Sequence, residues 1–194
     1  MTFGSIMTLM FTALLVENFI FSKFYGCCPF LGVSEKPDTA LGMGMAVTFV
    51  ITVASAATWA VYTFLLAPFG LDYLKTIAFI LVIAALVQFI EMFLRKFIPA
   101  LYNSLGIYLP LITTNCAVLS CALLIVQNEY NLLQAVCFGF AASLGFTLAI
   151  VVFAGLRVRM ENADPPRAFR GFPLTLITAG LLAMAFSCFS GINL

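Results

Sequence analysis

Long apolar segments dominate this chain, and its charged residues lie mostly in the short stretches between them. A helix of about twenty apolar residues is long enough to cross the hydrocarbon core of a bilayer. In that core, only helices and closed barrels satisfy every backbone hydrogen bond. The segments predict six helices, near residues 5–24, 39–66, 73–94, 100–126, 131–156 and 172–190. The chain is therefore predicted to be an all-α integral membrane protein with six transmembrane helices.

The composition supports this class and argues against others. Hydrophobic residues make up 63% of the chain and charged residues 9%, and the mean hydropathy is +1.13. The 194 residues leave no stretch long enough for a soluble domain, so a single membrane domain is expected over residues 1–194. A net charge of +1 argues against nucleic acid as a partner. The first segment lacks a basic start and contains Glu17 and Lys23, which argues against a cleavable signal peptide.

Basic residues sort to one side of the predicted membrane. Loops on the inner side of a membrane collect Lys and Arg. With both termini outside, the inner loops contain most of them: Lys36, Arg95, Lys96, Arg157, Arg159, Arg167 and Arg170. The clearest basic residue in an outer loop is Lys75. The predicted topology is therefore six spans with both termini outside.

The two halves of the chain show a weak internal repeat. Cys28 aligns with Cys116 at an offset of 116 − 28 = 88. Small residues align at an offset of 135 − 40 = 95: Ala40, Gly44 and Ala46 with Ala135, Gly139 and Ala141. Each half holds three spans, and an odd number turns the second half upside down. Two inverted three-helix repeats, 1–98 and 99–194, are predicted, an architecture whose functional sites lie near the midplane on interrupted helices.

The first and fourth segments are predicted to be broken helices. Each runs for more than thirty residues, which exceeds one straight crossing. Glycine and proline interrupt both: Gly26 and Pro29 in the first, Gly106 and Pro110 in the fourth. Such breaks are tolerated only where protein or a cofactor satisfies the freed backbone groups. Three polar residues of the fourth segment could do this, or could direct donors at the sulfur atoms of a ligand: Thr113, Thr114 and Asn115.

Two cysteines at matching positions of the broken segments suggest thiolate ligands for a metal. An iron-sulfur cluster takes four cysteine thiolates, and Cys28 and Cys116 would supply two of them. The natural completion is a second, similar subunit that gives two more. The alternative, that both are small buried packing residues, is left open by spacing alone. Packing is the preferred interpretation for the cysteines without a symmetry partner: Cys27, Cys121, Cys137 and Cys188.

An acidic residue also lies within the first predicted span. Glu17 is followed directly by Asn18. Acids in transmembrane segments are costly in lipid and commonly functional. An ion path, a quinone contact and a structural role are all open for Glu17.

The chain resembles a known family through motifs spread over almost its whole length. They are Lys23-Phe-Tyr-Gly-Cys-Cys-Pro-Phe-Leu-Gly-Val-Ser34, Thr48-Phe-Val, Ile80-Leu-Val-Ile-Ala84, Gln88-Phe-Ile-Glu-Met92 and Leu109-Pro-Leu-Ile-Thr-Thr-Asn-Cys-Ala117. The last motif is the most specific. The sequence resembles the A subunits of the Rnf ion-translocating electron-transport complex. These are related to membrane subunits of the sodium-pumping NADH:quinone reductase, and the Cys-Pro-Phe form of the first motif favours Rnf.

The resemblance implies a component of an ion-translocating oxidoreductase that is not catalytic alone. The Rnf complex passes electrons between ferredoxin and NAD, coupled to movement of Na⁺ or H⁺ across a bacterial or archaeal plasma membrane. Its A and E subunits are inverted paralogues, and they share an intramembrane [2Fe-2S] cluster with two cysteines from each. The two cysteines that the resemblance implies for this chain are Cys28 and Cys116. Further implied partners are the B, C, D and G subunits.

Two points qualify what the resemblance implies. Cys27 stands where the family has an apolar residue, so the assignment of Cys28 rests on its position before Pro29.

A six-span transporter subunit for a small molecule of the vitamin type is the alternative function. It would use the same inverted repeat and broken helices, with the cysteines as packing residues. Such a protein would purify without colour.

Overall fold

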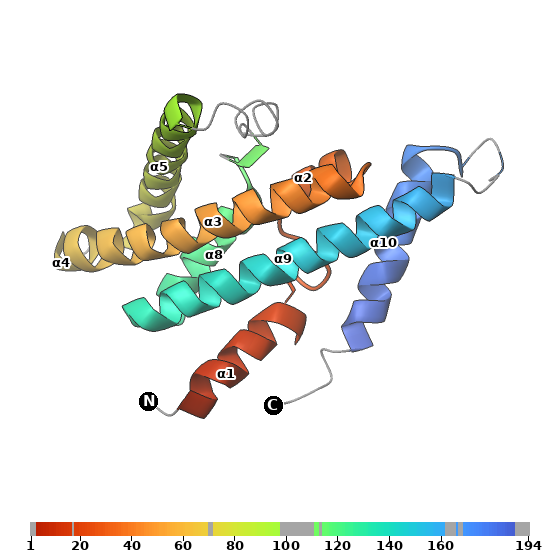
Figure 1. Ribbon diagram of the computed structural model, residues 1–194. Helices are drawn as coiled ribbons and strands as arrows, with labels where there is room; N and C mark the ends of the chain where they lie inside the picture. Colours follow the sequence, from red (N-terminus) through yellow and green to blue (C-terminus); the bar gives the residue numbers. More distant parts are fainter. Residues whose placement is uncertain are drawn as a thin grey trace. The chain divides into compact units, whose positions relative to one another are not determined.

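Every regular element in the described part of the chain is a helix (Figure 1). The computed structural model describes residues 3–16, 18–69, 72–97, 111–112, 114–161, 166 and 169–188. The α-helices are α1 (Phe3–Phe11), α2 (Cys27–Val33), α3 (Pro37–Val61), α4 (Ala67–Phe69), α5 (Lys75–Phe97), α8 (Cys116–Gln127), α9 (Leu132–Glu161) and α10 (Phe172–Ser187). Two π-helical turns, η1 (Thr12–Val16) and η2 (Tyr62–Leu66), continue α1 and α3, and a 3-10 turn, η3 (Asp72–Leu74), precedes α5. The all-α prediction is confirmed.

Three of the described helices are long and apolar enough to cross a membrane. They cover Pro37–Leu66, Lys75–Met92 and Leu132–Met160. Three shorter apolar helices cover Met7–Val16, Cys116–Gln127 and Phe172–Ser187. The predicted spans 39–66, 73–94, 131–156 and 172–190 agree with α3, α5, α9 and α10 to within a few residues. Six complete crossings stay a prediction.

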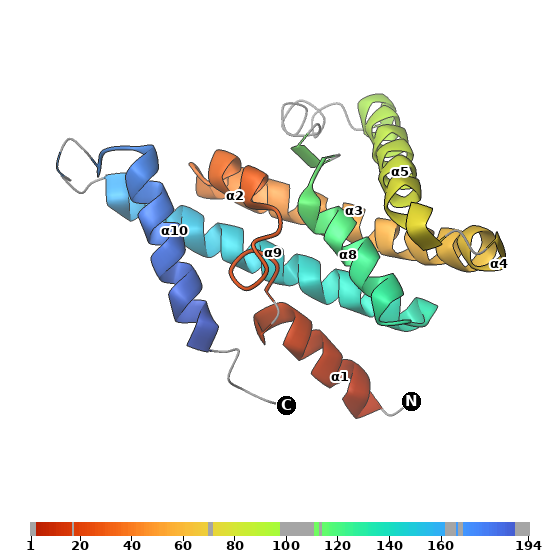
Figure 2. The same cartoon turned by 180° about the vertical axis from the view of Figure 1, so that it is seen from behind.

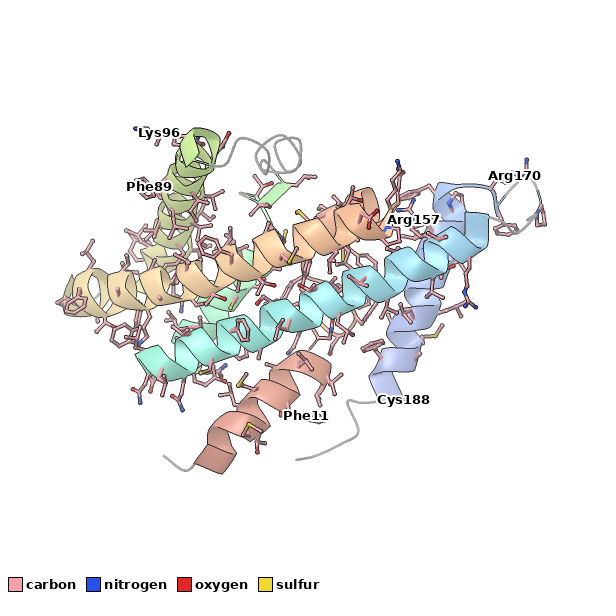
Figure 3. The ribbon with its side chains drawn as sticks, viewed as in Figure 1. Phe11, Phe89, Lys96, Arg157, Arg170 and Cys188 are labelled. Atoms are coloured by element: carbon pink, nitrogen blue, oxygen red, sulfur yellow. The ribbon has the colours of Figure 1, made fainter. Side chains whose placement is uncertain are left out.

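The outer face of α5 is strongly apolar. Ile77, Leu81 and Phe89 are 64%, 67% and 66% exposed, and Figure 3 labels Phe89 among the side chains on this helix. In water, so large an exposed apolar surface on one helix would be costly. Such a face suits contact with lipid or with another membrane protein.

The chain divides into two compact units, each built from both predicted repeats. Unit 1 contains residues 1–45 and 141–194, and unit 2 contains residues 46–140. Unit 1 therefore joins α1, α2 and the start of α3 to α10 and most of α9. Unit 2 joins the rest of α3 to α5, α8 and the start of α9.

In unit 1 the first segment is interrupted, as predicted, but the helix predicted over residues 5–24 extends only to Val16 among the described residues. The chain leaves the π-helical turn at Val16, and residues from Asn18 to Gly26 form turns before α2. Gly26 has a φ of 80°, a left-handed conformation that glycine adopts without strain, so the break predicted there is confirmed. Pro29 does not break the chain. It lies in the first turn of α2, where a missing N–H removes no helical hydrogen bond.

In unit 2 the fourth segment also breaks directly before its cysteine. Asn115 is extended, with φ −70° and ψ 116°, and α8 starts at Cys116. The fourth segment, predicted over 100–126 as a broken helix, is thus interrupted at Thr114 and Asn115. The predicted break residues Gly106 and Pro110 lie outside the described residues. Ser55 of α3 contacts α8, since its Oγ lies 3.6 Å from Cys121 Sγ. Figure 2 shows α8 beside α3.

Glycines allow close packing of α3 against α9 within each unit. In unit 1, a Cβ at Gly44 would overlap the Thr147 side chain, and in unit 2 a Cβ at Gly139 would overlap Ser55. Gly44 and Gly139 thus allow the two helices to approach closely. Gly42, on another face of α3, has open space around it.

Every buried position of α3 corresponds to a buried position of α9 at the offset of 95. The buried residues of α3 are Ala40, Met43, Gly44, Val47, Val50, Ile51, Ala54, Ser55 and Thr58. Adding 95 to each number gives residues of α9: Ala135, Phe138, Gly139, Ala142, Gly145, Phe146, Ala149, Ile150 and Phe153. Every one of these is buried as well. The offset that aligns the small residues in the sequence therefore also aligns the buried faces.

Candidate site: two helix starts that carry exposed cysteines

Cys28 lies in the first turn of α2 and its thiol is exposed. The neighbouring Cys27 is only half-buried, and its Sγ donates a hydrogen bond to the Phe24 carbonyl at 3.1 Å. The two adjacent thiols are therefore not equivalent, because one already has a backbone partner. This difference favours Cys28 over Cys27 as the thiol available to a ligand.

Asn18 orders the break that precedes α2. Its side chain is fully buried, and Oδ1 accepts hydrogen bonds from the Ile20 and Phe21 amides at 3.1 and 3.4 Å. Its Nδ2 donates to the Gly145 carbonyl of α9 at 2.9 Å. One amide thus satisfies backbone groups that the break frees, which is the requirement for irregular backbone inside a membrane. Gly145 permits the approach, because a Cβ there would lie 2.7 Å from the Leu14 carbonyl oxygen.

The body and the end of α2 are also held by α9. Phe30 stacks on Phe153, with ring centroids 4.3 Å apart and planes at 25°. Arg157 Nη1 donates to the Leu31 carbonyl and to Ser34 Oγ, each at 2.9 Å. The sequence places Arg157 in an inner loop, but the structure places it inside α9, which continues to Glu161. Its role escapes sequence reasoning because its partners are more than 120 residues away along the chain.

Cys116 is the first residue of α8, and its thiol is exposed. Asn115 caps this helix, since its Oδ1 accepts a hydrogen bond from the Ala117 amide at 3.0 Å. This bond fixes which side of the amide carries the NH₂ group. Asn115 is only 3% exposed, yet its Nδ2 has no hydrogen-bond partner among the described residues. An unpaired buried donor costs about 1–3 kcal/mol, so a ligand acceptor beside Cys116 would remove a penalty.

The other cysteines differ from this pair in position or exposure. Cys121 is buried against Ser55, and Cys137 is half-buried in α9. Cys188 is exposed but follows the last turn of α10. Among the described cysteines, only Cys28 and Cys116 combine an exposed thiol with a place in the first turn of a helix that follows a break.

Each cysteine-bearing helix is fastened by the long helix of the other predicted repeat. In unit 1, Arg157 of α9 bonds to the end of α2. In unit 2, Trp59 of α3 donates from Nε1 to the Tyr130 carbonyl, just beyond the end of α8, at 3.0 Å. Because Cys28 belongs to unit 1 and Cys116 to unit 2, each half of the site is described separately.

Of the remaining predicted site residues, the structure describes only Thr114. Thr114 is exposed in the turn before Asn115. Glu17, Pro110 and Thr113 lie outside the described residues. In the described part of the chain, no three His, Cys, Asp or Glu side chains are close enough to hold a metal ion together.

These features define a class: an α-helical membrane protein with an exposed thiol at the start of each of two short helices. The model of the family described as "Rnf-Nqr subunit, membrane protein" matches residues 6–193. The chain belongs to the Rnf-Nqr family of membrane subunits.

Several curated relatives are similar over almost the whole chain. One is the A subunit of the Na(+)-translocating ferredoxin:NAD(+) oxidoreductase complex of Acetobacterium woodii, 58% identical over 96% of this chain and 97% of the relative. Another is the A subunit of the ion-translocating oxidoreductase complex of Syntrophotalea carbinolica, 58% identical over 97% of both chains. The relative of the same name from Serratia proteamaculans is 57% identical over 92% of both. The predicted resemblance to A subunits is confirmed.

Proposed function

We propose that this chain is a membrane subunit of an ion-translocating oxidoreductase that exchanges electrons between ferredoxin and NAD. The observation that carries the proposal is the 58% identity, over almost the full length of both chains, to a relative whose name states that activity. Relatives named as oxidoreductase subunits favour this function over the small-molecule transporter. The chain does not act alone, and the coupled ion is Na⁺ or H⁺.

Within that complex, Cys28 and Cys116 provide two thiolate ligands of an intramembrane [2Fe-2S] cluster. The donor set fits such a group, because both thiols are exposed and cysteine thiolates are the usual ligands of these clusters. Four thiolates are needed, so two come from a second protein, the inverted E paralogue. A bound cluster would accept and release single electrons, which makes it a relay across the membrane.

The buried amide of Asn115 is the second feature that fits a sulfur-containing ligand. Its Nδ2 donor lies one residue before Cys116 and has no acceptor in the part of the chain that the structure describes. Hydrogen bonds to the sulfur atoms of a cluster tune its reduction potential. The chain's own contribution is therefore to hold Cys116 at a capped helix start, with a spare donor beside it.

The inverted repeat of three plus three spans is part of the same proposal. The matching buried faces of α3 and α9 at the offset of 95 support it. With both termini outside, the basic loops lie inside, as they commonly do. The B, C, D and G subunits would complete the complex, and Glu17 is a candidate for the ion path.

Replacement of the cysteines in the intact complex tests this function. Membrane vesicles with Cys28→Ser or Cys116→Ser should lose NAD reduction by reduced ferredoxin, because the relay is interrupted. Cys188→Ser is the matched control, since it removes an exposed thiol outside the site and should leave the activity intact. Full activity in the Cys28→Ser and Cys116→Ser vesicles, with the complex assembled, would refute the relay.

A further inference from the structure

Arg157 binds the end of the helix that carries Cys28, and no feature of the sequence indicates this. Figure 3 shows the Arg157 side chain at the end of α9, beside the orange segment of unit 1. One nitrogen, Nη1, donates to two acceptors at 2.9 Å, the Leu31 carbonyl and Ser34 Oγ. The other, Nη2, lies 3.8 Å from a carboxylate oxygen of Glu35.

The positive charge of Arg157 interacts mainly with the carboxyl-terminal end of α2. The side chain of Arg157 is 19% exposed, whereas that of Glu35 is 74% exposed, so solvent screens this ion pair. Ser34, in contrast, is fully buried. A cation at the carboxyl-terminal end of a helix meets unpaired carbonyls and the negative end of the helix dipole. The two short hydrogen bonds therefore matter more than the salt bridge.

The helix α2 needs external support because it is too short to be stable alone. It has seven residues, and isolated helices below about twelve residues are marginal in water, even with alanine-rich sequences. The residue that precedes it as the N-cap, Gly26, has no side chain that could cap the helix. From α9, the Phe153 ring packs on Phe30 in its body and Arg157 bonds to its end, in addition to the Phe21 ring on Phe30 and the Thr39 hydroxyl on the Val33 carbonyl. The Arg157 contacts on α2 thus lie three and six residues from Cys28, less than two helical turns away.

We infer that Arg157 is a positioning residue for the Cys28 thiolate. The inference rests on the proposed ligand role of Cys28. Arg157 contacts no reacting atom; it sets the position and rigidity of the helix that presents the thiol. Arginine is suited to this task, because its planar guanidinium bonds several oxygen acceptors at once, whereas lysine offers a single flexible ammonium.

The test compares Arg157→Met, Arg157→Lys and Arg159→Met in the purified complex. Arg159 is exposed on the same helix two residues later, so its loss controls for charge alone. The electron paramagnetic resonance signal of the cluster is taken as the difference from the Cys28→Ser complex. Amide hydrogen exchange of residues 30–34, followed by mass spectrometry, reports the stability of α2 without reference to the cluster.

The expected result for Arg157→Met is a shifted midpoint potential, altered g-values and roughly tenfold faster exchange in α2, since two hydrogen bonds to a charged donor are lost. Arg157→Lys should restore part of each change, and Arg159→Met should match the wild type. A wild-type signal and potential in Arg157→Met would overturn the inference, whatever the exchange rates show. An equal shift in Arg159→Met would overturn it as well.

The same experiment separates this inference from the proposed function. If Cys28→Ser leaves the cluster signal unchanged, the ligand assignment of Cys28 is wrong, and positioning toward a cluster falls with it. The exchange rates then decide whether Arg157 stabilises α2. Rates that Arg157→Met does not change would overturn that part too.

Discussion

Two buried asparagines bond to backbone amides at the two helix breaks. Asn18 uses both ends of its amide to satisfy backbone groups around the first break. Asn115 uses one end to cap α8, and the other end has no partner among the described residues. An amide can donate and accept at once, which suits it to irregular backbone in a region that lacks water. The unequal use of the two amides predicts different effects of their replacement.

Replacement of Asn115 by serine should lower the midpoint potential of the cluster. Serine is as good an N-cap as asparagine, so α8 should keep its start, while the amide donor is lost and the charge is unchanged. A donor to sulfur stabilises the reduced, more negative form of a cluster. A redox titration followed by electron paramagnetic resonance measures the change. Asn128→Ser, at an exposed position, is the control; a potential that Asn115→Ser leaves unchanged or raises would contradict this role.

Replacement of Asn18 by leucine should destabilise the protein by about 3 kcal/mol or more, because it leaves buried amides of the break without acceptors. Thr8→Val is the matched control. It removes a hydrogen bond to the Gly4 carbonyl at 3.0 Å from an exposed position of the same segment, and should cost little. Thermal unfolding in detergent compares the two. Equal losses in both variants would show that Asn18 does not hold the break.

At the scale of elements, the small residues of α3 divide into two kinds. Gly44 faces Thr147 across a close helix contact, whereas Gly42 has open space around it. A methyl group at Gly44 must displace packed atoms, which typically costs about 1–3 kcal/mol. The same group at Gly42 meets nothing and removes the entropic penalty of glycine in a helix, worth about 1 kcal/mol.

These two glycines therefore predict opposite outcomes for the same substitution. Gly44→Ala should lower the midpoint of thermal unfolding, and Gly42→Ala should leave it unchanged or raise it. Measurement of both variants in one detergent makes each the control for the other. A fall of equal size in both would contradict the close contact at Gly44.

The sequence predicts the elements well and the breaks only in part. Apolar length is enough to predict α3, α5, α9 and α10, because a membrane span needs a minimum number of apolar residues. Gly26 signals the first break, since glycine accepts a positive φ. The loss of helix from residue 18 onward is not signalled, because it depends on the Asn18 contact with Gly145, 127 residues away.

The candidate site can likewise be predicted from the sequence only in part. The motif residues Cys28 and Cys116 can be found from the sequence because they stand beside glycine, proline or polar residues in apolar segments. The exposure that separates Cys28 from Cys27, and the fastening by Arg157 and Trp59, depend on tertiary contacts. Neither a local pattern nor a composition encodes such contacts.

At the scale of the whole molecule, each cysteine-bearing helix is held by the long helix of the other predicted repeat. In an inverted repeat, each cysteine-bearing helix would therefore depend on the long helix of the other repeat for its position. This dependence also explains why the compact units do not coincide with the repeats. The loop charges add an orientation to this arrangement, and the orientation can be tested directly.

Reporters fused to either end of the chain should give the same result. Alkaline phosphatase, which is active only outside the cytoplasm, should be active at both termini, and green fluorescent protein should be dark at both when exported unfolded. A fusion after residue 96, in a predicted inner loop, should behave oppositely. Termini on opposite sides would contradict the even number of spans, and two inner termini would contradict the orientation.

The most direct test of the central claim is to measure iron and the electron paramagnetic resonance spectrum of the purified, reduced complex, in the wild type and in Cys28→Ser, Cys116→Ser and Cys188→Ser. The account predicts that each of the first two substitutions removes one [2Fe-2S] signal and about two iron atoms per complex. Cys188→Ser should change neither. If assembled Cys28→Ser and Cys116→Ser complexes keep the full iron content and the wild-type spectrum, these cysteines are not the ligands and the relay through this chain is refuted.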